Sequence, residues 1–325
     1  MIVVGGGPAG LSAALVLGRA RHSVLLLDDG RYRNDRSREL HGYLTRDRVL
    51  PEELRRLGRA EIRRYGVEFL ESRAVDARRD PYGRFRIRTS DGRVARSRML
   101  LLATGVRDRI PSIPGIDSLY GVSVHHCPFC DGWEWRDRPL AVYGRGEGGA
   151  GLAHSLLSWS RDVALLTDGP SRLSGSTARS LARRGVTVRT ERVVRLEGRS
   201  GRLRRVHFRG GDTLERDALF LATGNEARTD LAQRLECRFK RGSIWTDQRD
   251  CASVAGVYVA GDASRDVQFA IVAAAEGARA AVRIHQELVL AERAAASGPL
   301  GSTRGRAIPP AALLRPPDHP RSVRG

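Results

Sequence analysis

A short apolar strand that runs into a glycine-rich turn and then a helix occurs twice in this chain, and it constrains the fold more than any other feature. In the first copy, residues 1–4 are apolar, and Gly5, Gly7 and Gly10 form a G-x-G-x-x-G turn. Such glycines allow a tight turn and a close approach to a pyrophosphate at the helix N-terminus. The next strand ends at Asp28, where an acid accepts hydrogen bonds from ribose hydroxyls. The segment therefore predicts a dinucleotide-binding unit.

The second copy enters its turn from a strand over 139–143. Its glycines are Gly144, Gly146 and Gly149. A helix, a strand at 163–166 and a hairpin follow, and each copy closes on an Ala-Thr-Gly sequence after an apolar strand. The first unit thus runs from Gly5 to Gly105 and the second from Gly144 to Gly224. Two copies of one design predict two domains of the same architecture.

A last apolar strand at 256–260 and an alanine-rich helix from about 268 to 292 close the first domain. We therefore predict an α/β fold with two Rossmann-like, three-layer ββα dinucleotide-binding domains, the second inserted in the first. The expected bounds are 1–108 and 237–294 for the two parts of the first domain, 109–236 for the inserted domain, and 295–325 for a tail that is flexible or docked on a partner subunit.

The net charge of +19 is the one extreme property of the composition, and strong positive charge suggests nucleic acid or an anionic membrane as a partner. The arginines are scattered, however, Lys240 is the only lysine, and no nucleic-acid motif accompanies them. The longest apolar runs have about five to seven residues, far short of a membrane span. The N-terminus enters a strand without the pattern of a secretory signal. We expect a cytoplasmic protein that binds neither nucleic acid nor membrane.

Cys127 and Cys130 form a Cys-x-x-Cys pair, which in a cytosolic protein indicates redox or metal chemistry. The alternatives to a redox pair are a zinc half-site and two structural thiols. Zinc needs four ligands, and the sequence has no second Cys-x-x-Cys and no H-x-x-x-H motif, so we expect no metal. Cys237 and Cys251 lack such spacing and are expected to be packing thiols. The pair predicts a redox-active disulfide.

Over about residues 1–293 the chain resembles the thioredoxin reductase branch of the two-dinucleotide-domain flavoprotein reductases. The resemblance rests on the glycine turn at 5–10, Ala-Thr-Gly at 103–105, Cys-Pro-Phe-Cys-Asp-Gly at 127–132 and the segment 256–262. In that family the first and last segments bind FAD, the middle segment carries a nicotinamide site and the redox cysteines, and the protein is typically a homodimer. The resemblance implies FAD-binding positions at Gly5, Gly7, Pro8, Ala9, Gly10, Asp28, Thr104, Gly105, Gly261, Asp262, Phe269 and Ala270.

The family pattern also implies roles within this set. The first turn and Asp28 would hold the ADP half of FAD, and Asp262 would bind the ribityl chain. The backbone at Phe269 and Ala270, where the last helix opens, would face the pyrimidine end of the isoalloxazine.

For the redox pair, the resemblance implies that Cys130 lies next to the flavin and forms the transfer adduct. Cys127 would be the interchange thiol that meets the substrate. Asp131 matches the family's acid beside the second cysteine, which is suited to carry a proton.

Two histidines directly precede Cys127, and near pH 7 an imidazole can take a thiol proton. Adjacency makes His126 the candidate base, with an ordinary loop histidine as the alternative. His125 would point the other way if the segment is extended. His41 is a further candidate because the family chain passes near the flavin there.

The chain departs from the family after the second strand of the inserted domain. Thioredoxin reductases normally carry a basic His-Arg-Arg type cluster there, which binds the 2′-phosphate of NADPH. Here residues 165–172 place Asp168 at that position, and Glu147 lies in the second glycine turn. Because a carboxylate repels a phosphate, NADPH is disfavoured. NADH remains possible, since Asp168 could accept from a free ribose.

Three functions stay open. Cys-Pro-Phe-Cys-Asp-Gly-Trp-Glu at 127–134, Ser-Trp-Ser-Arg-Asp at 158–162 and Leu-Thr-Asp-Gly at 166–169 look like the dithiol oxidases that close the disulfide of gliotoxin- and holomycin-type natural products. Such an enzyme takes electrons from a small-molecule dithiol through the cysteine pair and FAD to O2, giving peroxide. The alternatives are a thioredoxin-type reductase using NAD(P)H or another donor, and a non-catalytic flavin-bound regulator.

Overall fold

The structure is a computed structural model that describes residues 1–248, 250–264 and 267–296. The chain divides into two compact units. Unit 1 comprises residues 1–32, 53–106 and the described residues from 227 onward, and unit 2 comprises residues 33–52 and 107–226. The tail expected at 295–325 lies, from residue 297 on, outside the described residues.

Unit 1 is built on a five-stranded parallel sheet with the strand order β20-β7-β1-β2-β3. These strands are β1 (Ile2–Val4), β2 (Leu25–Asp28), β3 (Glu68–Glu71), β7 (Leu100–Leu102) and β20 (Val257–Val259). A three-stranded antiparallel sheet consists of β4 (Ala74–Arg79), β5 (Phe85–Thr89) and β6 (Val94–Ser97). The other elements are α1 (Pro8–Arg19), α2 (Pro51–Arg63), α6 (Asp230–Arg234), β18 (Phe239–Lys240), β19 (Ser243–Ile244) and α7 (Ala270–Ala296).

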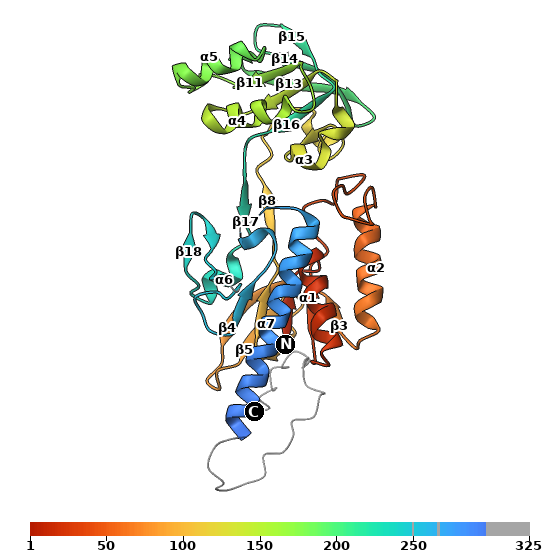
Figure 1. The fold of residues 1–325 in the computed structure, drawn as a ribbon, viewed down its shortest axis with the longest axis vertical. Coiled ribbons are helices and arrows are strands. Elements are labelled where there is room, and N and C mark those ends of the chain that lie inside the picture. Colours follow the sequence, from red (N-terminus) through yellow and green to blue (C-terminus); the bar gives the residue numbers. More distant parts are fainter. Residues whose placement is uncertain (249, 265–266, 297–325) are drawn as a thin grey trace, which may run out of the picture. The chain divides into compact units, whose positions relative to one another are not determined.

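Alternate residues of the parallel strands face opposite layers of unit 1. Ile2 of β1 packs in a core with Phe85 of the antiparallel sheet. The next residue, Val3, packs in a second core with Leu17 of α1 and Ile284 of α7, two helices that lie side by side (Figure 1). Unit 1 is therefore a three-layer ββα domain.

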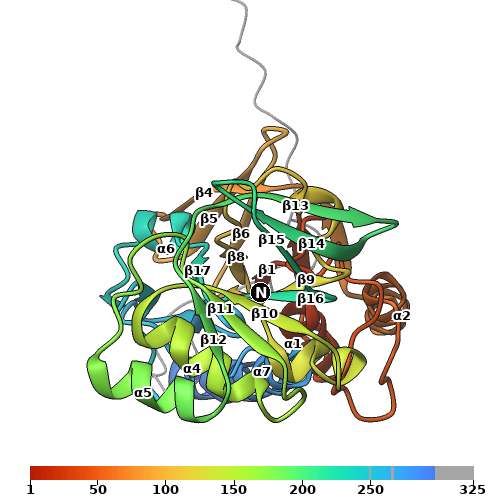
Figure 2. The ribbon, with the colours of Figure 1, turned by 90° about the horizontal axis from the view of Figure 1, so that it is seen from above.

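Unit 2 repeats these layers. Its parallel sheet has the order β12-β11-β10-β16-β9, with β9 (Val124–His125), β10 (Leu140–Tyr143), β11 (Val163–Leu166), β12 (Thr187–Arg189) and β16 (Ala218–Leu221). Helices α4 (Gly146–Leu156) and α5 (Gly175–Arg183) cover one side of the sheet (Figure 2). The antiparallel strands β13 (Val193–Arg199), β14 (Arg202–Phe208) and β15 (Thr213–Glu215) cover the other side. The predicted fold class is confirmed.

The two Ala-Thr-Gly sequences anchor the chain where it passes between the units. Two short strands, β8 (Val106–Asp108) and β17 (Asn225–Ala227), pair at this passage. Thr104 Oγ1 donates to the carbonyl of Arg228 at 2.8 Å, and Thr223 Oγ1 donates to the carbonyl of Arg109. The glycine after each threonine accepts from the N–H of the same arginine at 3.0 Å. The two Ala-Thr-Gly sequences thus make the same pair of hydrogen bonds, each to the backbone of one arginine.

Two details differ from the sequence-based expectations. The last helix begins at Ala270, two residues after the expected start, and continues to Ala296. The predicted boundaries assign residues 33–52 to the first domain and residues 227–236 to the inserted domain, whereas the structure groups 33–52 with unit 2 and 227–236 with unit 1. Arg33 and Arg36 bond to Asp108 and Asp117 of unit 2, and Leu231 and Leu235 pack in the core of unit 1. No helix in the described ranges has the length and apolarity to cross a membrane.

Candidate active site

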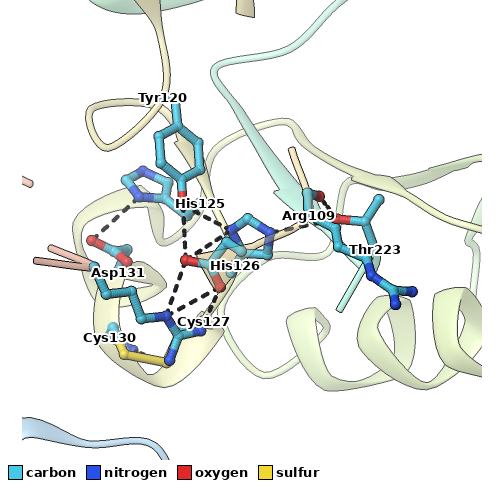
Figure 3. Close-up of polar contacts among 10 residues, drawn as sticks. Arg109, Tyr120, His125, His126, Cys127, Cys130, Asp131 and Thr223 are labelled. Carbon is cyan, nitrogen blue, oxygen red and sulfur yellow. Dashed lines mark hydrogen bonds and ion pairs between the residues drawn. A yellow bond between two sulfur atoms is a disulfide. The ribbon is translucent and has the colours of Figure 1, made fainter. Parts of the chain in front are cut away.

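The redox cysteines lie at a one-turn helix of unit 2, α3 (Pro128–Asp131). Cys127 is its N-cap in extended conformation, and Pro128 takes the first helical position, where a missing N–H costs no hydrogen bond. This turn joins Cys127 and Cys130 in a disulfide with Cα atoms 5.3 Å apart (Figure 3). Gly132 follows for a steric reason, since a Cβ there would overlap the Pro128 carbonyl and lie 2.9 Å from the Trp159 ring. Residues 127–132 therefore form the helical turn and the disulfide, together the redox turn, from local sequence alone.

The carboxylate of Asp131 lies beside His125, not beside His126. Asp131 Oδ1 lies 3.3 Å from His125 Nδ1 (Figure 3), and Trp135 Nε1 donates to His125 Nε2 at 3.0 Å. An indole nitrogen only donates, so His125 Nε2 must accept and the ring proton lies on Nδ1, toward the carboxylate. His125 is buried, while 22% of the Asp131 side chain is exposed. The fixed imidazole thus orients an acid that solvent can reach.

His126 belongs to a different hydrogen-bond network (Figure 3). Its Nδ1 lies 3.2 Å from the Tyr120 hydroxyl, and its Nε2 lies 3.4 Å from Thr223 Oγ1. Burial lowers the pKa of His126, although Asp108, 3.9 Å away, opposes the shift. The ring is therefore neutral at pH 7 and, among the described residues, makes no hydrogen bond to a cysteine sulfur.

Arg33 and Asp108 support the His126 network. Arg33 Nη2 and Nε donate to the two Asp108 oxygens at 2.7 and 3.0 Å, and the Tyr120 hydroxyl donates to Asp108 Oδ2 at 3.0 Å. Burial opposes ionisation of Asp108, but the bonds and charge of Arg33 outweigh it and lower the pKa of this carboxyl. Sequence analysis missed these partners. Only Thr223 carried a signal, its place in the second Ala-Thr-Gly.

The first glycine turn lies between β1 and α1 of unit 1. A Cβ on Gly5 would overlap the Ala103 carbonyl, and one on Gly10 would overlap the Gly5 carbonyl, so only glycine fits. A Cβ on Gly7 would meet no atom within 4 Å, and no side chain caps the helix that starts at Pro8. The open N–H groups of this 12-residue helix suit the pyrophosphate of FAD.

Asp28 lies beside this turn, buried at the end of β2. Its Oδ1 accepts from the N–H of Gly6 at 3.2 Å, and its Oδ2 accepts from Arg59 Nη2 at 2.9 Å and from the Tyr32 hydroxyl. The Nε of Arg59 is buried with no hydrogen-bond partner among the described residues, which leaves a donor for a ligand. This donor set fits the ADP part of FAD. No sequence motif pointed to Arg59 or Tyr32.

The remaining expected FAD positions lie where β20 leads into α7. Gly261 has a φ of 78°, which favours glycine, and its N–H donates to Glu276 Oε2 at 2.6 Å. A Cβ on Gly261 would lie 3.0 Å from Cβ of Ala9 in α1. Asp262 opens a 3-10 turn, and α7 begins just after Phe269. Sequence analysis missed Glu276, although an acid within an alanine-rich helix was a signal for a buried hydrogen bond.

At the second glycine turn, side chains of unit 2 occupy the end of β11. Arg145 Nε donates to the Thr167 carbonyl at 2.5 Å, and its Nη2 bonds to both the carbonyl and Oδ2 of Asp168. Asp168 Oδ2 also accepts from the Tyr143 hydroxyl at 3.1 Å, and Oδ1 accepts from the Val193 N–H at 2.9 Å. Burial, with Asp168 beside it, raises the pKa of Tyr143 to about 12, so the phenol stays a donor. Both oxygens of Asp168 are thus engaged within the chain.

Glu147 adds a second negative charge at this turn. It lies in the first turn of α4, where the Thr177 hydroxyl donates to its Oε1 at 3.0 Å. The acid therefore adds negative charge to the first turn of the helix at whose N-terminus a pyrophosphate would bind.

The other two cysteines have no role in this chemistry. Burial raises the pKa of Cys237 to about 11, and burial is also the main cause of the raised pKa of Cys251. Both thiols are protonated at pH 7. Within the described ranges, no group of three His, Cys, Asp or Glu side chains could hold a metal ion.

A helix-borne disulfide in a chain with two dinucleotide-type domains defines a disulfide oxidoreductase. Residues 1–277 match the family model for pyridine nucleotide-disulphide oxidoreductases. The chain belongs to this family, and FAD is its cofactor.

Several of the known relatives are thioredoxin reductases. A probable thioredoxin reductase of Arthroderma benhamiae is 30% identical, and the match covers 91% of this chain and 82% of that protein. The thioredoxin reductase aclD of Aspergillus oryzae is 30% identical, with 90% and 97% covered. The crystal structure of HlmI gives a TM-score of 0.87 at 36% identity, covering 91% of this chain and 94% of that chain. The predicted resemblance to thioredoxin reductases is confirmed.

Proposed function

We propose that this chain is an FAD-dependent dithiol oxidase, which closes an intramolecular disulfide in a small natural-product dithiol. The observation that carries the proposal is the end of β11, where Arg145, Tyr143 and the Val193 N–H engage both oxygens of Asp168. A 2′-phosphate there would meet this carboxylate in place of a cationic pair, at a cost of about 1 kcal/mol or more at close range. With NADPH disfavoured, electrons enter from a dithiol.

The thiol chemistry needs only the substrate and the cysteine pair. A substrate thiolate attacks Cys127 Sγ, the bond between Cys127 and Cys130 breaks, and Cys130 leaves as the thiolate. The second substrate thiolate attacks the substrate sulfur of the mixed disulfide, which releases Cys127 and the cyclic disulfide. Two electrons and two protons have then moved from the substrate to the cysteines. FAD, when bound, would supply the two-electron acceptor for the reduced cysteines, and O2 would be the final acceptor of the two electrons and two protons, as H2O2.

Asp131 is the proposed proton carrier for the Cys130 sulfur. It follows Cys130 directly, and its Oδ1 lies 3.3 Å from His125 Nδ1. The other carboxylate oxygen is then available to exchange a proton. His126 remains the second candidate base beside Cys127, and it would have to leave Tyr120 or Thr223 to reach the sulfur.

A thioredoxin-type disulfide reductase is the second candidate. It is favoured by the relatives in Arthroderma benhamiae and Aspergillus oryzae, whose names state thioredoxin reductase. The two functions use the same cysteine chemistry in opposite directions, so the electron donor decides between them. For either function we propose a cytoplasmic homodimer, as the family resemblance implies.

The test is the stoichiometry of aerobic turnover. With dithiothreitol as the substrate and no nicotinamide, one O2 should be consumed and one H2O2 formed for each disulfide. A Cys127→Ser variant should keep its FAD but lose this activity, because Cys130 alone cannot complete the exchange. A Cys130→Ser variant has no bond between Cys127 and Cys130 for the substrate thiolate to break, so it should also keep its FAD and lose this activity. Near-native turnover by either variant would contradict the assigned roles.

A further inference from the structure

A cavity of about 610 Å³ lies within unit 2 and includes Asp131 in its wall. This volume is in the range of small-molecule sites. The charged side chains of its wall are four arginines and four carboxylates, and two histidines, His41 and His125, also line it. Because Asp131 also ends the helix that carries Cys130, the cavity adjoins the redox turn.

Two of the four carboxylates of the cavity wall are paired with arginines, and the other two lie beside histidines. Asp217 lies 3.7 Å from Arg138, and Glu39 pairs with Arg48 outside the wall. Asp131 Oδ1 lies 3.3 Å from His125 Nδ1, and Glu134 lies 3.6 Å from His41. Arginine charge therefore neutralises Asp217 and Glu39.

Three arginines of the wall lack such compensation. Arg38 Nη2 donates to the neutral carbonyl of Ser200 at 3.3 Å. Arg202 and Arg204 stand two residues apart on β14, and among the described residues neither has a carboxylate within ion-pair distance. Their neighbour Arg205, by contrast, pairs with Glu215 at 3.3 Å. The part of the wall formed by these arginines thus carries positive charge that no neighbouring carboxylate of the described residues neutralises, and such charge attracts an anion.

We propose that this cavity binds the anionic group, a carboxylate or its equivalent, of the dithiol substrate. The proposal rests on the function proposed above and narrows it to dithiols that carry a negative charge. Arg202 and Arg204 would hold the anion by charge-assisted hydrogen bonds, with Arg38 adding positive charge. Asp131 of the wall belongs to the helix that carries Cys130, so the anion would be bound in the same unit as the redox turn.

Lipoate and lipoamide test this proposal because they differ in one charge. Calorimetric titration of the oxidised holoenzyme should give about tenfold tighter binding of lipoate than of lipoamide, equal to one charge-assisted bond of about 1.4 kcal/mol. The variant R202Q/R204Q should lose this preference. The matched control R205Q, on the same strand but outside the cavity, should keep it.

Equal binding of lipoate and lipoamide by the native protein would overturn the proposal, and so would an unchanged preference in R202Q/R204Q. Turnover of the reduced forms is a separate measurement. If the reduced forms of both probes fail to give peroxide while the binding preference holds, the dithiol oxidase function is contradicted and the anion site stands.

Discussion

At the scale of single residues, His125 carries its ring proton on Nδ1, which lies 3.3 Å from Asp131 Oδ1. Trp135 fixes this tautomer by donating to the opposite ring nitrogen. Sequence reasoning favoured His126 because it adjoins Cys127, but adjacency does not show which way a ring turns. The side chains at 125 and 126 point into different networks, as neighbours in extended backbone do.

Replacing His125 tests whether this geometry matters for proton movement. His125→Leu should slow the anaerobic reduction of the flavin by dithiothreitol by roughly tenfold to a hundredfold, because Asp131 loses the donor that orients it. His125→Asn should recover much of the rate, since an amide N–H can donate from near the position of Nδ1. Stopped-flow absorbance measures both variants. Equal rates for the leucine and asparagine variants would reduce His125 to a packing role.

Stability should depend on pH through His126. Burial lowers the pKa of His126 in the folded protein below 6.5, the ordinary value for a histidine side chain. The unfolded chain therefore takes up a proton at a pH where the folded protein does not. The free energy of unfolding should therefore fall as the pH drops below 6.5, by up to about 1.4 kcal/mol per pH unit. Chemical denaturation of native protein and His126→Gln at pH 7.5 and 5.5 should show a smaller fall in the variant. An equal fall in both would contradict this account.

At the scale of elements, the glycine turns made both parallel sheets predictable, because strand, turn, helix and acid recur in one order. The one-turn helix α3 is set by a proline and an N-cap, and the sequence analysis did not predict it as a helix. The covering of Asp168 by Arg145 could not be predicted either. An arginine in a glycine turn is equally able to bind a phosphate, and only the fold shows that it bonds to Thr167 and Asp168.

Two glycines of the first turn have different steric roles. Gly10→Ala would press a Cβ against the Gly5 carbonyl and should lower the free energy of unfolding of the apoprotein by about 1–3 kcal/mol. Gly7→Ala places its Cβ in open space, so the apoprotein should keep its stability while losing affinity for FAD. Urea titrations and FAD content measure the two effects. Similar destabilisation by both substitutions would refute the steric assignment.

At the scale of the whole molecule, the repeat and its family were predictable because they depend on local patterns. The network around His126 was not, since it joins Arg33, Asp108 and Thr223 from distant parts of the sequence. The cavity could not be predicted for the same reason, because Arg202 and Arg204 of its wall lie on β14 and Asp131 lies on α3. Three of the arginines that are scattered in the sequence line this cavity in the folded chain, where we propose the anion site.

The direction of electron flow is the central claim, and anaerobic flavin absorbance tests it most directly. Oxidised holoenzyme is mixed under anaerobic conditions with dithiothreitol, NADH or NADPH in separate experiments. The account predicts that the dithiol bleaches the flavin band rapidly, that air restores the colour with peroxide formed, and that NADPH bleaches it slowly or not at all. Rapid stoichiometric bleaching by micromolar NADPH, with sustained reduction of a thioredoxin-like protein, would contradict the oxidase assignment and establish the reductase.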